Sequence, residues 1–366
     1  MDSSNNAYVV CPYQREKPEE AERSLAEMIR LCQSAGLAVV GSEIVRVRTA
    51  TGAFFLGTGQ MRRVAHQAEE SDAGVIIFDR PITPAQMRNW ARETNREIYD
   101  RHGVILEIFA QRAKTRDAQL QVELARAGYA QSHVVGMWQH LSRQGGGSRL
   151  ARGEGEKQIE MDRRRLAERV TRAQRGLEKL TRQRTVQRAR RGTQFRAALV
   201  GYTNAGKSSL LNALSNAQVV QADKLFATLD PTTRRLFIPP DITILLTDTV
   251  GFVRNLPPQL VQAFHSTLEE ALEAQIILHV VDMADPEAFQ HIAVTNGILK
   301  ELGANEIPQI LVLNKADRCE DPVEQEVMFR GTLPKAEAVM LVSARQGTGV
   351  PELRELLAAI HQRLLP

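Results

Sequence analysis

The sequence has no apolar run close to the ~20 residues that a membrane-spanning helix needs, and its longest apolar runs are of strand length. Its first residues, MDSSNNAYVV, lack the basic start and apolar stretch of a secretory signal peptide. It has only three cysteines, Cys11, Cys32 and Cys319, and no C-x-x-C spacing. These absences argue against a membrane protein, a disulfide framework and a cysteine-built zinc site, and they predict a cytoplasmic protein.

Positive and negative charges are unevenly distributed along the 366 residues, whose net charge is +4. Residues 149–191 have a net charge of +9, residues 192–366 of −6 and residues 1–148 of +1. The basic block favours a polyanionic partner, because each cationic side chain placed on a phosphate releases counterions. A solvated, charge-rich helix explains the same pattern equally well.

Apolar runs alternate with helix-compatible stretches at both ends of the chain. Residues 7–110 contain short apolar runs such as AYVV, GVIIFD and GVILEIFA, which is typical of a small α/β domain. Further on, strands are expected at 195–201, 242–248, 275–282, 309–315 and 338–344. Nearly continuous apolar strands belong in a mostly parallel sheet with helices on both faces.

The middle segment, residues 115–191, reads as two long helices joined by the glycine-rich loop GGGSRLARGEGE. In the second helix, expected from about residue 157 to 191, six apolar residues form one seam: Ile159, Leu166, Val170, Ala173, Leu177 and Leu180. We therefore expect an antiparallel hairpin with a basic tip. The alternative is a linker helix that packs on a neighbouring domain.

The segment GYTNAGKS, residues 201–208, fits the phosphate-loop pattern G-x-x-x-x-G-K-[ST]. It follows an expected strand and opens an expected helix, the context that separates a phosphate loop from a chance match. Its backbone N–H groups would wrap phosphates at a helix N-terminus. Lys207 would reach the β- and γ-phosphates, and the Ser208 hydroxyl would bind Mg²⁺.

A D-x-x-G motif, residues 248–251, ends the strand expected at 242–248. An acid at this place holds Mg²⁺ directly or through water, and the Gly251 amide can sense the γ-phosphate. Residues 225–235, LFATLDPTTRR, should order around the γ-phosphate, with a threonine hydroxyl completing the Mg²⁺ shell. Three threonines qualify chemically, and spacing alone does not choose among them: Thr228, Thr232 and Thr233.

Two further motifs are expected to recognise the base of the nucleotide. NKAD, residues 314–317, places a carboxylate at Asp317 that can accept from N1–H and the 2-amino group of guanine. Adenine offers neither donor on that edge, so the acid favours guanine. SAR, residues 343–345, would donate hydrogen bonds from its backbone amides to the guanine O6. Four motifs in this order, each at a strand end, predict a magnesium-dependent domain that binds and hydrolyses GTP.

With these motifs assembled, the chain resembles the HflX family of ribosome-associated GTPases. Besides the phosphate loop and NKAD, the resemblance rests on FLGTGQ (55–60), IFAQRAKTRDAQLQVELA (108–125), RGEGEKQIEMDRRR (152–165), LFATLDPTTR (225–234) and DTVGFVRNLP (248–257). It implies that Thr228 is the switch threonine on Mg²⁺. It also implies a contact with the large ribosomal subunit, through rRNA and ribosomal protein, and a role in splitting or rescuing stalled or idle ribosomes or in ribosome biogenesis.

The expected architecture is α/β in three parts: an N-terminal α/β domain (1–114), a basic helical hairpin with a glycine-rich tip (115–192) and a Ras-like P-loop GTPase domain (193–366). The catalytic candidates are Lys207, Thr228 and Gly251, and the metal ligands are Ser208 and Thr228, with Asp248 acting through water. The nucleotide site is expected to comprise Gly201, Tyr202, Thr203, Asn204, Ala205, Gly206, Lys207, Ser208, Phe226, Ala227, Thr228, Leu229, Asp230, Asp248, Thr249, Val250, Gly251, Asn314, Lys315, Ala316, Asp317, Ser343, Ala344 and Arg345. The RNA-binding candidates are Arg149, Arg152, Arg163, Arg164 and Arg165.

Two positions depart from familiar patterns. The stretch RGEGEKQIE, residues 152–160, carries Glu154 and Lys157 where the family usually has proline and threonine, which leaves its RNA contact open. Phe252 follows D-x-x-G, where Ras-like enzymes have a glutamine that orients the attacking water. Hydrolysis should therefore be slow for the isolated protein and faster on a ribosome.

Asn204 stands where several related GTPases with an apolar residue after D-x-x-G hold K⁺, so K⁺ is a further expected cofactor beside Mg²⁺. GTP, GDP and the large ribosomal subunit are the expected partners of a monomer without a membrane span. The alternative function is a regulatory GTP switch that recruits a protein effector without direct RNA contact.

Overall fold

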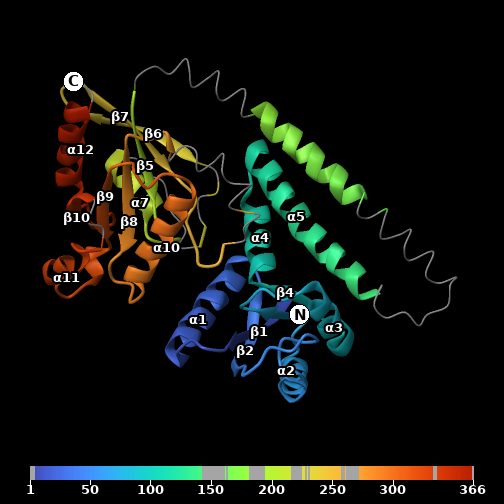
Figure 1. The fold of residues 1–366 in the computed structure, drawn as a ribbon. Coiled ribbons are helices and arrows are strands. Elements are labelled where there is room, and N and C mark those ends of the chain that lie inside the picture. The colour runs from blue at the N-terminus through green and yellow to red at the C-terminus, as the bar shows by residue number, and fades with distance from the viewer. Residues whose placement is uncertain are drawn as a thin grey trace. The chain divides into compact units, whose positions relative to one another are not determined.

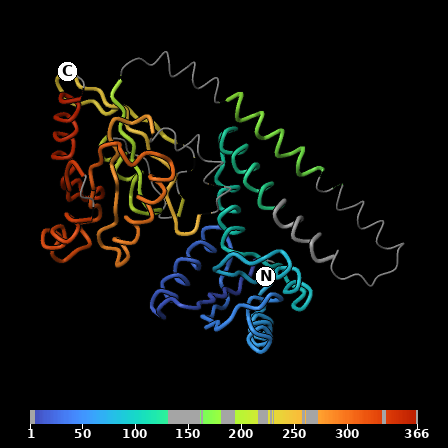
Figure 2. Tube along the Cα trace, viewed as in Figure 1, coloured from blue at the N-terminus to red at the C-terminus, as the bar shows by residue number. Residues whose placement is uncertain are grey.

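The computed structural model describes residues 5–141, 161, 164–180, 194–215, 225–226, 229, 231–256, 260, 272–332 and 336–364, with the side chains of 131–141 left out (Figure 2). The chain divides into two compact units. One consists of Met1–Gln111 and Gln119–Leu177, and the other of Arg112–Ala118 and Glu178–Pro366. Within the described part of the chain, no helix has the length and apolar character needed to cross a membrane.

The first unit contains a parallel four-stranded sheet in the order β2-β1-β3-β4. Its strands are β1 (Asn6–Tyr13), β2 (Ala38–Arg46), β3 (Val75–Phe78) and β4 (Glu97–Asp100). The helices that connect and follow them are α1 (Pro18–Ser34), α2 (Thr58–Glu70), α3 (Pro84–Thr94) and α4 (Arg101–Arg112) (Figure 1). All four residues of β3 are buried, as expected of an inner strand in a parallel sheet.

The apolar run at residues 103–110 lies in helix α4 and not in a strand. The neighbouring strand is EIYD, residues 97–100, a short segment with little apolar character. Five apolar residues of α4 are at most 2% exposed: Val104, Ile105, Leu106, Ile108 and Phe109. A helix buried on most sides loses the 3.6-residue period, so its sequence resembles that of a buried strand.

A buried ion pair network lies at the carboxyl-terminal edge of this first sheet. The Arg101 guanidinium pairs with the Glu27 carboxylate and donates to Asp79 Oδ1 at 2.6 Å. Burial raises the pKa of Asp79, and the Arg101 charge opposes that rise. The three side chains therefore depend on one another, because removing the cation would leave two carboxylates buried without it.

Helix α5 (Arg116–Leu141) and the helix at residues 164–180 run antiparallel. A Cβ at Gly176 would lie 2.8 Å from Leu120 Cδ1, and Arg169 pairs with Glu123 at 3.4 Å. The later residue of α5 therefore contacts the earlier residue of the other helix, as in an antiparallel pair. The described seam residues Leu166, Val170, Ala173, Leu177 and Leu180 are buried or half-buried, which confirms the predicted apolar stripe. The turn of the hairpin lies outside the described residues.

The second unit contains a six-stranded sheet in the order β10-β9-β8-β5-β7-β6, with only β6 antiparallel to its neighbour. Its strands are β5 (Phe195–Val200), β6 (Thr232–Ile238), β7 (Ile242–Asp248), β8 (Ile276–Asp282), β9 (Gln309–Asn314) and β10 (Ala336–Leu341). The five predicted strands are confirmed to within two residues at their starts and three at their ends. The edge strand β6 was not expected, since only one of its residues, Leu236, is buried.

Helices cover both faces of this sheet. On one face, Leu210 of α7 (Lys207–Ser215) and Leu357 of α12 (Val350–Leu364) belong to the same apolar cluster as Leu199 and Val312 of the sheet. On the other face, α10 (Ala288–Glu301) and α11 (Pro322–Phe329) pack on residues such as Leu311 (Figure 1). The predicted α/β class, with a mostly parallel sheet between helix layers, is confirmed.

Candidate nucleotide site

The predicted motifs of the second unit gather at one edge of its sheet. The phosphate loop follows β5, Asp248 ends β7, Asn314 ends β9 and Ser343 lies just beyond β10. These strands are parallel, so their carboxyl ends meet at the same edge, where α/β sheets bind ligands.

The phosphate loop has little room for side chains at two of its glycines. A Cβ at Gly201 would lie 2.1 Å from the Val280 carbonyl oxygen, and one at Gly206 would lie 2.2 Å from Asn314 Nδ2. Gly206 also has a φ of +92°, a backbone conformation that L side chains rarely adopt. Glycine is therefore required at both positions by the close approach of β8 and the NKAD segment.

Lys207 is the first residue of α7, and its ammonium points back into the loop. Nζ donates to the carbonyl oxygens of Gly201 and Tyr202 at 3.1 and 3.0 Å. Burial lowers the pKa of Lys207 to about 8, and the Asp248 carboxylate opposes this shift. A phosphate brought to this place would favour the charged ammonium.

Two oxygen donors that suit Mg²⁺ converge at the start of α7. Ser208 Oγ donates to Asp248 Oδ2 at 2.5 Å, and Asp248 is 1% exposed. P-loop GTPases in general use Mg²⁺, and a hydroxyl beside a carboxylate fits the preference of this ion for hard oxygen ligands.

The threonine that would complete the metal shell stays a prediction. Thr228 lies outside the described residues, as do Ala227 and Asp230. Both other candidates belong to β6: Thr232 is opposite Asp248 in the ladder, and the Thr233 and Thr247 hydroxyls share a hydrogen bond of 2.9 Å.

Thr203 connects the phosphate loop to both segments expected to respond to the γ-phosphate. Its Oγ1 accepts from the Phe226 amide at 2.9 Å, and its amide donates to the Phe252 carbonyl at 2.6 Å. The Phe252 amide donates to the Gly201 carbonyl at 3.1 Å. Phe252 itself is 1% exposed, so it is a packing residue in this conformation.

Gly251 also lies close to the phosphate loop. A Cβ there would lie 2.8 Å from Thr203 Cα and 3.1 Å from Lys207 Nζ. The remaining D-x-x-G residues are buried, and Thr249 donates its hydroxyl to the Leu199 carbonyl at 2.8 Å. The motif is thus anchored on β5 and brings its glycine beside the lysine.

Asn314 joins three of the motifs. Its Nδ2 donates to the Ala205 carbonyl at 2.9 Å, and its Oδ1 accepts from the Ala344 amide at 3.0 Å. Asn314 is 2% exposed, which makes it a buried structural link as well as a site residue. Asp317 is half-buried beside Ala316, and Arg345 is exposed.

Lys315 connects the base-reading segment directly to the phosphate loop, and it pairs with an acid that was not predicted from the sequence. Its Nζ donates to the Asn204 carbonyl at 2.8 Å and pairs with Asp282 Oδ2 at 2.6 Å. Asp282 ends β8, so the signal that could have identified it is an acid at the end of the strand IILHVVD.

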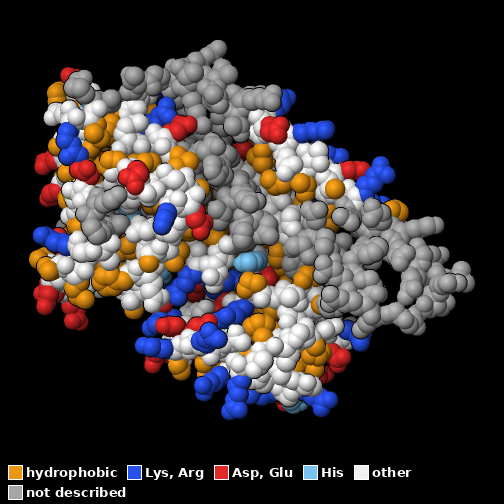
Figure 3. Space-filling view, in the orientation of Figure 1, with side chains coloured by type: hydrophobic (Ala, Val, Ile, Leu, Met, Phe, Trp, Pro, Cys, Tyr) orange, Lys and Arg blue, Asp and Glu red, His pale blue; other side chains and the backbone are white. Residues whose placement is uncertain are grey.

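The described candidates for RNA contact lie on the helix at 164–180. The Arg164 side chain is 81% exposed and pairs with Glu168 at 3.3 Å, and Arg165 is also exposed. Lys and Arg side chains lie along the outer side of this helix (Figure 3). Arg149, Arg152 and Arg163 lie outside the described residues.

A phosphate loop, D-x-x-G, N-K-x-D and S-A at one edge of a mostly parallel sheet define the class of P-loop GTPases. Family models match most of the chain: "GTP-binding GTPase N-terminal" at residues 22–110, "GTP-binding GTPase Middle Region" at 112–191 and "50S ribosome-binding GTPase" at 196–315.

Among the relatives are proteins named GTPase HflX from Magnetococcus marinus and Escherichia coli. The first is 44% identical over 95% of this chain and 80% of its own length, and the second is 43% identical over 83% and 71%. A solved complex of SsGBP with GDP has a TM-score of 0.54 at 24% identity, over 98% of each chain, and shares the fold. The chain therefore belongs to the HflX family of GTPases, and it hydrolyses GTP.

Proposed function

We propose that this GTPase binds the large ribosomal subunit in its GTP form and uses hydrolysis to time its release. Binding and release of this kind would split or rescue stalled or idle ribosomes, or serve ribosome biogenesis. The observation that carries the proposal is the match of residues 196–315 to a ribosome-binding GTPase family, together with an exposed basic helix elsewhere in the chain.

We propose the following roles in the nucleotide site. Lys207 binds the β- and γ-phosphates, the Gly251 amide senses the γ-phosphate, and Asp317 accepts from guanine. Ser208 and Thr228 would hold Mg²⁺, with Asp248 acting through water, and the ion would neutralise developing phosphate charge. Phe252 offers no group that orients water, so the isolated protein should turn over slowly and depend on the ribosome to order its switch segments.

The distribution of charge supports a division of labour. The GTPase segment, residues 192–366, has a net charge of −6 and is poorly suited to approach RNA, whereas residues 149–191 carry +9. Arg164 and Arg165 are exposed in the described part of that block. We therefore assign the RNA contact to the hairpin, including Arg149, Arg152 and Arg163.

A regulatory switch that recruits a protein effector is the second candidate. One feature favours it: the apolar residues Val323, Val327 and Met328 on α11 are 64–65% exposed.

The salt dependence of the interaction separates the two functions. The affinity of the chain for the large ribosomal subunit should fall steeply between 50 and 200 mM salt, by about 10³ or more if six phosphates are bound. An affinity that is nearly independent of salt would contradict an RNA contact and support the protein effector.

A further inference from the structure

The start of α10 contacts both the phosphate loop and the segment after D-x-x-G. The His291 imidazole stacks on the Tyr202 ring, with 3.7 Å between centroids and 12° between planes. Tyr202 Oη accepts a hydrogen bond from the Arg254 amide at 2.9 Å, and the Arg254 guanidinium pairs with the Glu287 carboxylate. Because the His291 amide donates to the Glu287 carbonyl at 2.9 Å, these interactions form a closed ring.

The ring is largely withdrawn from water. Tyr202, Glu287 and His291 are 6%, 8% and 9% exposed, and Val253, between Phe252 and Arg254, is fully buried. An ion pair and an aromatic stack in such surroundings hold their partners more firmly than they would on a surface. The ring therefore fixes the backbone at Arg254 relative to the phosphate loop.

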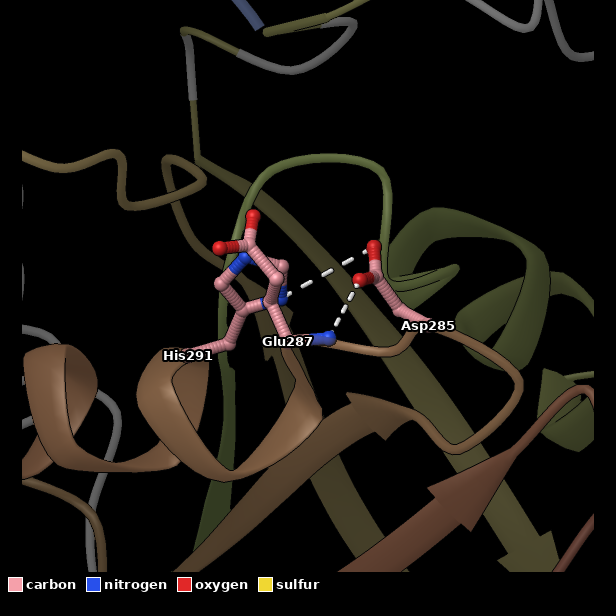
Figure 4. Close-up of side chains that lie close together, drawn as sticks. All are labelled: Asp285, Glu287 and His291. Carbon is pink, nitrogen blue, oxygen red and sulfur yellow. Dashed lines mark hydrogen bonds and ion pairs between the residues drawn. The ribbon is translucent and has the colours of Figure 1, made fainter. Parts of the chain in front are cut away.

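Asp285 fixes the first turn of α10 itself. Its Oδ1 accepts from the Glu287 amide at 2.9 Å, and its Oδ2 lies 4.0 Å from His291 Nδ1 (Figure 4). The ligand atoms of Asp285, Glu287 and His291 lie within 4.8 Å of one another, but the Glu287 carboxylate is already paired with Arg254. Their arrangement is explained by positioning and needs no metal ion.

Gly251 is three residues before Arg254, and the intervening Phe252 is tied to the loop by two backbone hydrogen bonds. The position of the Gly251 amide, which would meet the γ-phosphate, is thus constrained by the two residues Phe252 and Arg254 that follow it. Since Phe252 has no group that can orient water, correct placement of this backbone matters more here than in an enzyme with a catalytic glutamine.

We infer that Glu287 and His291 are positioning residues, which act through Arg254 and Tyr202 to hold Gly251 where it recognises a γ-phosphate. This inference rests on the proposed nucleotide site. It predicts a specific defect, because GDP lacks the γ-phosphate and makes no use of Gly251. Loosening the ring should weaken binding of the triphosphate and slow hydrolysis while leaving GDP affinity unchanged.

The test compares the full chain with Glu287→Gln, His291→Ala and His291→Phe, using fluorescent GDP and a fluorescent non-hydrolysable GTP analogue. Glu287→Gln and His291→Ala should lower affinity for the analogue and kcat about tenfold each, with GDP affinity changed less than about twofold. His291→Phe keeps an aromatic ring on Tyr202 and should restore most of the affinity and turnover.

Equal affinities for the analogue in the parent and all variants, or a parallel weakening for GDP and the analogue, would overturn the inference. The second of these outcomes would mean that the residues only stabilise the domain. If instead the unaltered chain binds neither nucleotide, the proposed site fails, and the two failures are thereby distinguished.

Discussion

Ser343 Oγ donates to Asp317 Oδ1 at 2.6 Å, which joins the two motifs expected to read the base. Ser343 is 1% exposed and its Oγ also accepts from the Gln346 amide at 3.1 Å, so the hydroxyl is held in one orientation. One oxygen of the carboxylate is thereby fixed in place, and the acid is oriented before guanine arrives.

Asp317→Asn should weaken GTP binding by about 10²-fold or more, because one guanine donor loses its acceptor and another faces an amide NH₂. Xanthine has a carbonyl where guanine has its 2-amino group, so the variant should bind xanthosine nucleotides better than the parent does. Titration with fluorescent guanosine and xanthosine diphosphates measures both effects. Unchanged guanine affinity would show that NKAD is not the base reader.

The lowered pKa of Lys207 gives triphosphate binding a pH dependence. The ammonium is present below its pKa of about 8 and is lost above it, so at higher pH a proton must be taken up for the charged interaction to form. Affinity for the GTP analogue should fall about fivefold between about pH 7.5 and 8.8.

The matched control is Lys207→Arg, whose guanidinium stays protonated throughout this range. It should bind more weakly at every pH, because the loop is built around a lysine, but without the decline. If the affinity of this variant for the analogue declined with pH to the same extent, a group other than Lys207 would be responsible for the pH dependence.

How much could be predicted from sequence differs between local and tertiary features. The phosphate loop, D-x-x-G and NKAD were predictable because each is a short segment at the end of a strongly apolar strand. The helix α4 was not, because an apolar run such as 103–110 carries no period that separates a buried helix from a strand. The stack of Tyr202 on His291 joins residues 89 positions apart, and no local pattern marks it.

Reversing charge on the basic helix tests the RNA contact. The variant changes five arginines to glutamate: Arg149, Arg152, Arg163, Arg164 and Arg165. It should bind GTP normally and lose ribosome-stimulated turnover. Partial reversals should flatten the salt slope of binding by about one unit for each phosphate that the variant no longer binds.

A matched control changes Arg62 and Arg92 to glutamate. These two residues are exposed on α2 and α3 and lie outside the basic block at 149–191. The control is compared with a double variant in which only Arg164 and Arg165 are changed to glutamate. Both double variants change the net charge by the same amount. Equal losses of ribosome-stimulated turnover in the two double variants would indicate a general effect of charge. Full stimulation of the five-residue variant by ribosomes would mean that the hairpin has a structural role and does not contact RNA.

Asn204 leads to a prediction about monovalent ions. Its side chain is exposed while its carbonyl accepts from Lys315, so the amide is available for a cation beside the phosphates. GTP hydrolysis should be faster in potassium than in sodium buffer, because a bound cation there can neutralise transition-state charge. Asn204→Ala should abolish the difference. Equal rates in both buffers, with and without ribosomes, would contradict a potassium site.

The most direct test of the proposed function is co-sedimentation of the full chain with isolated large ribosomal subunits. The measurement is made in parallel with GTP, GDP and a non-hydrolysable GTP analogue. We expect the chain to pellet with the subunit in the presence of the analogue and to be largely released in the presence of GDP. With GTP, the fraction that pellets should be intermediate and should fall as hydrolysis proceeds. Binding that is absent in all three, or equal in all three, would contradict a ribosome contact timed by GTP.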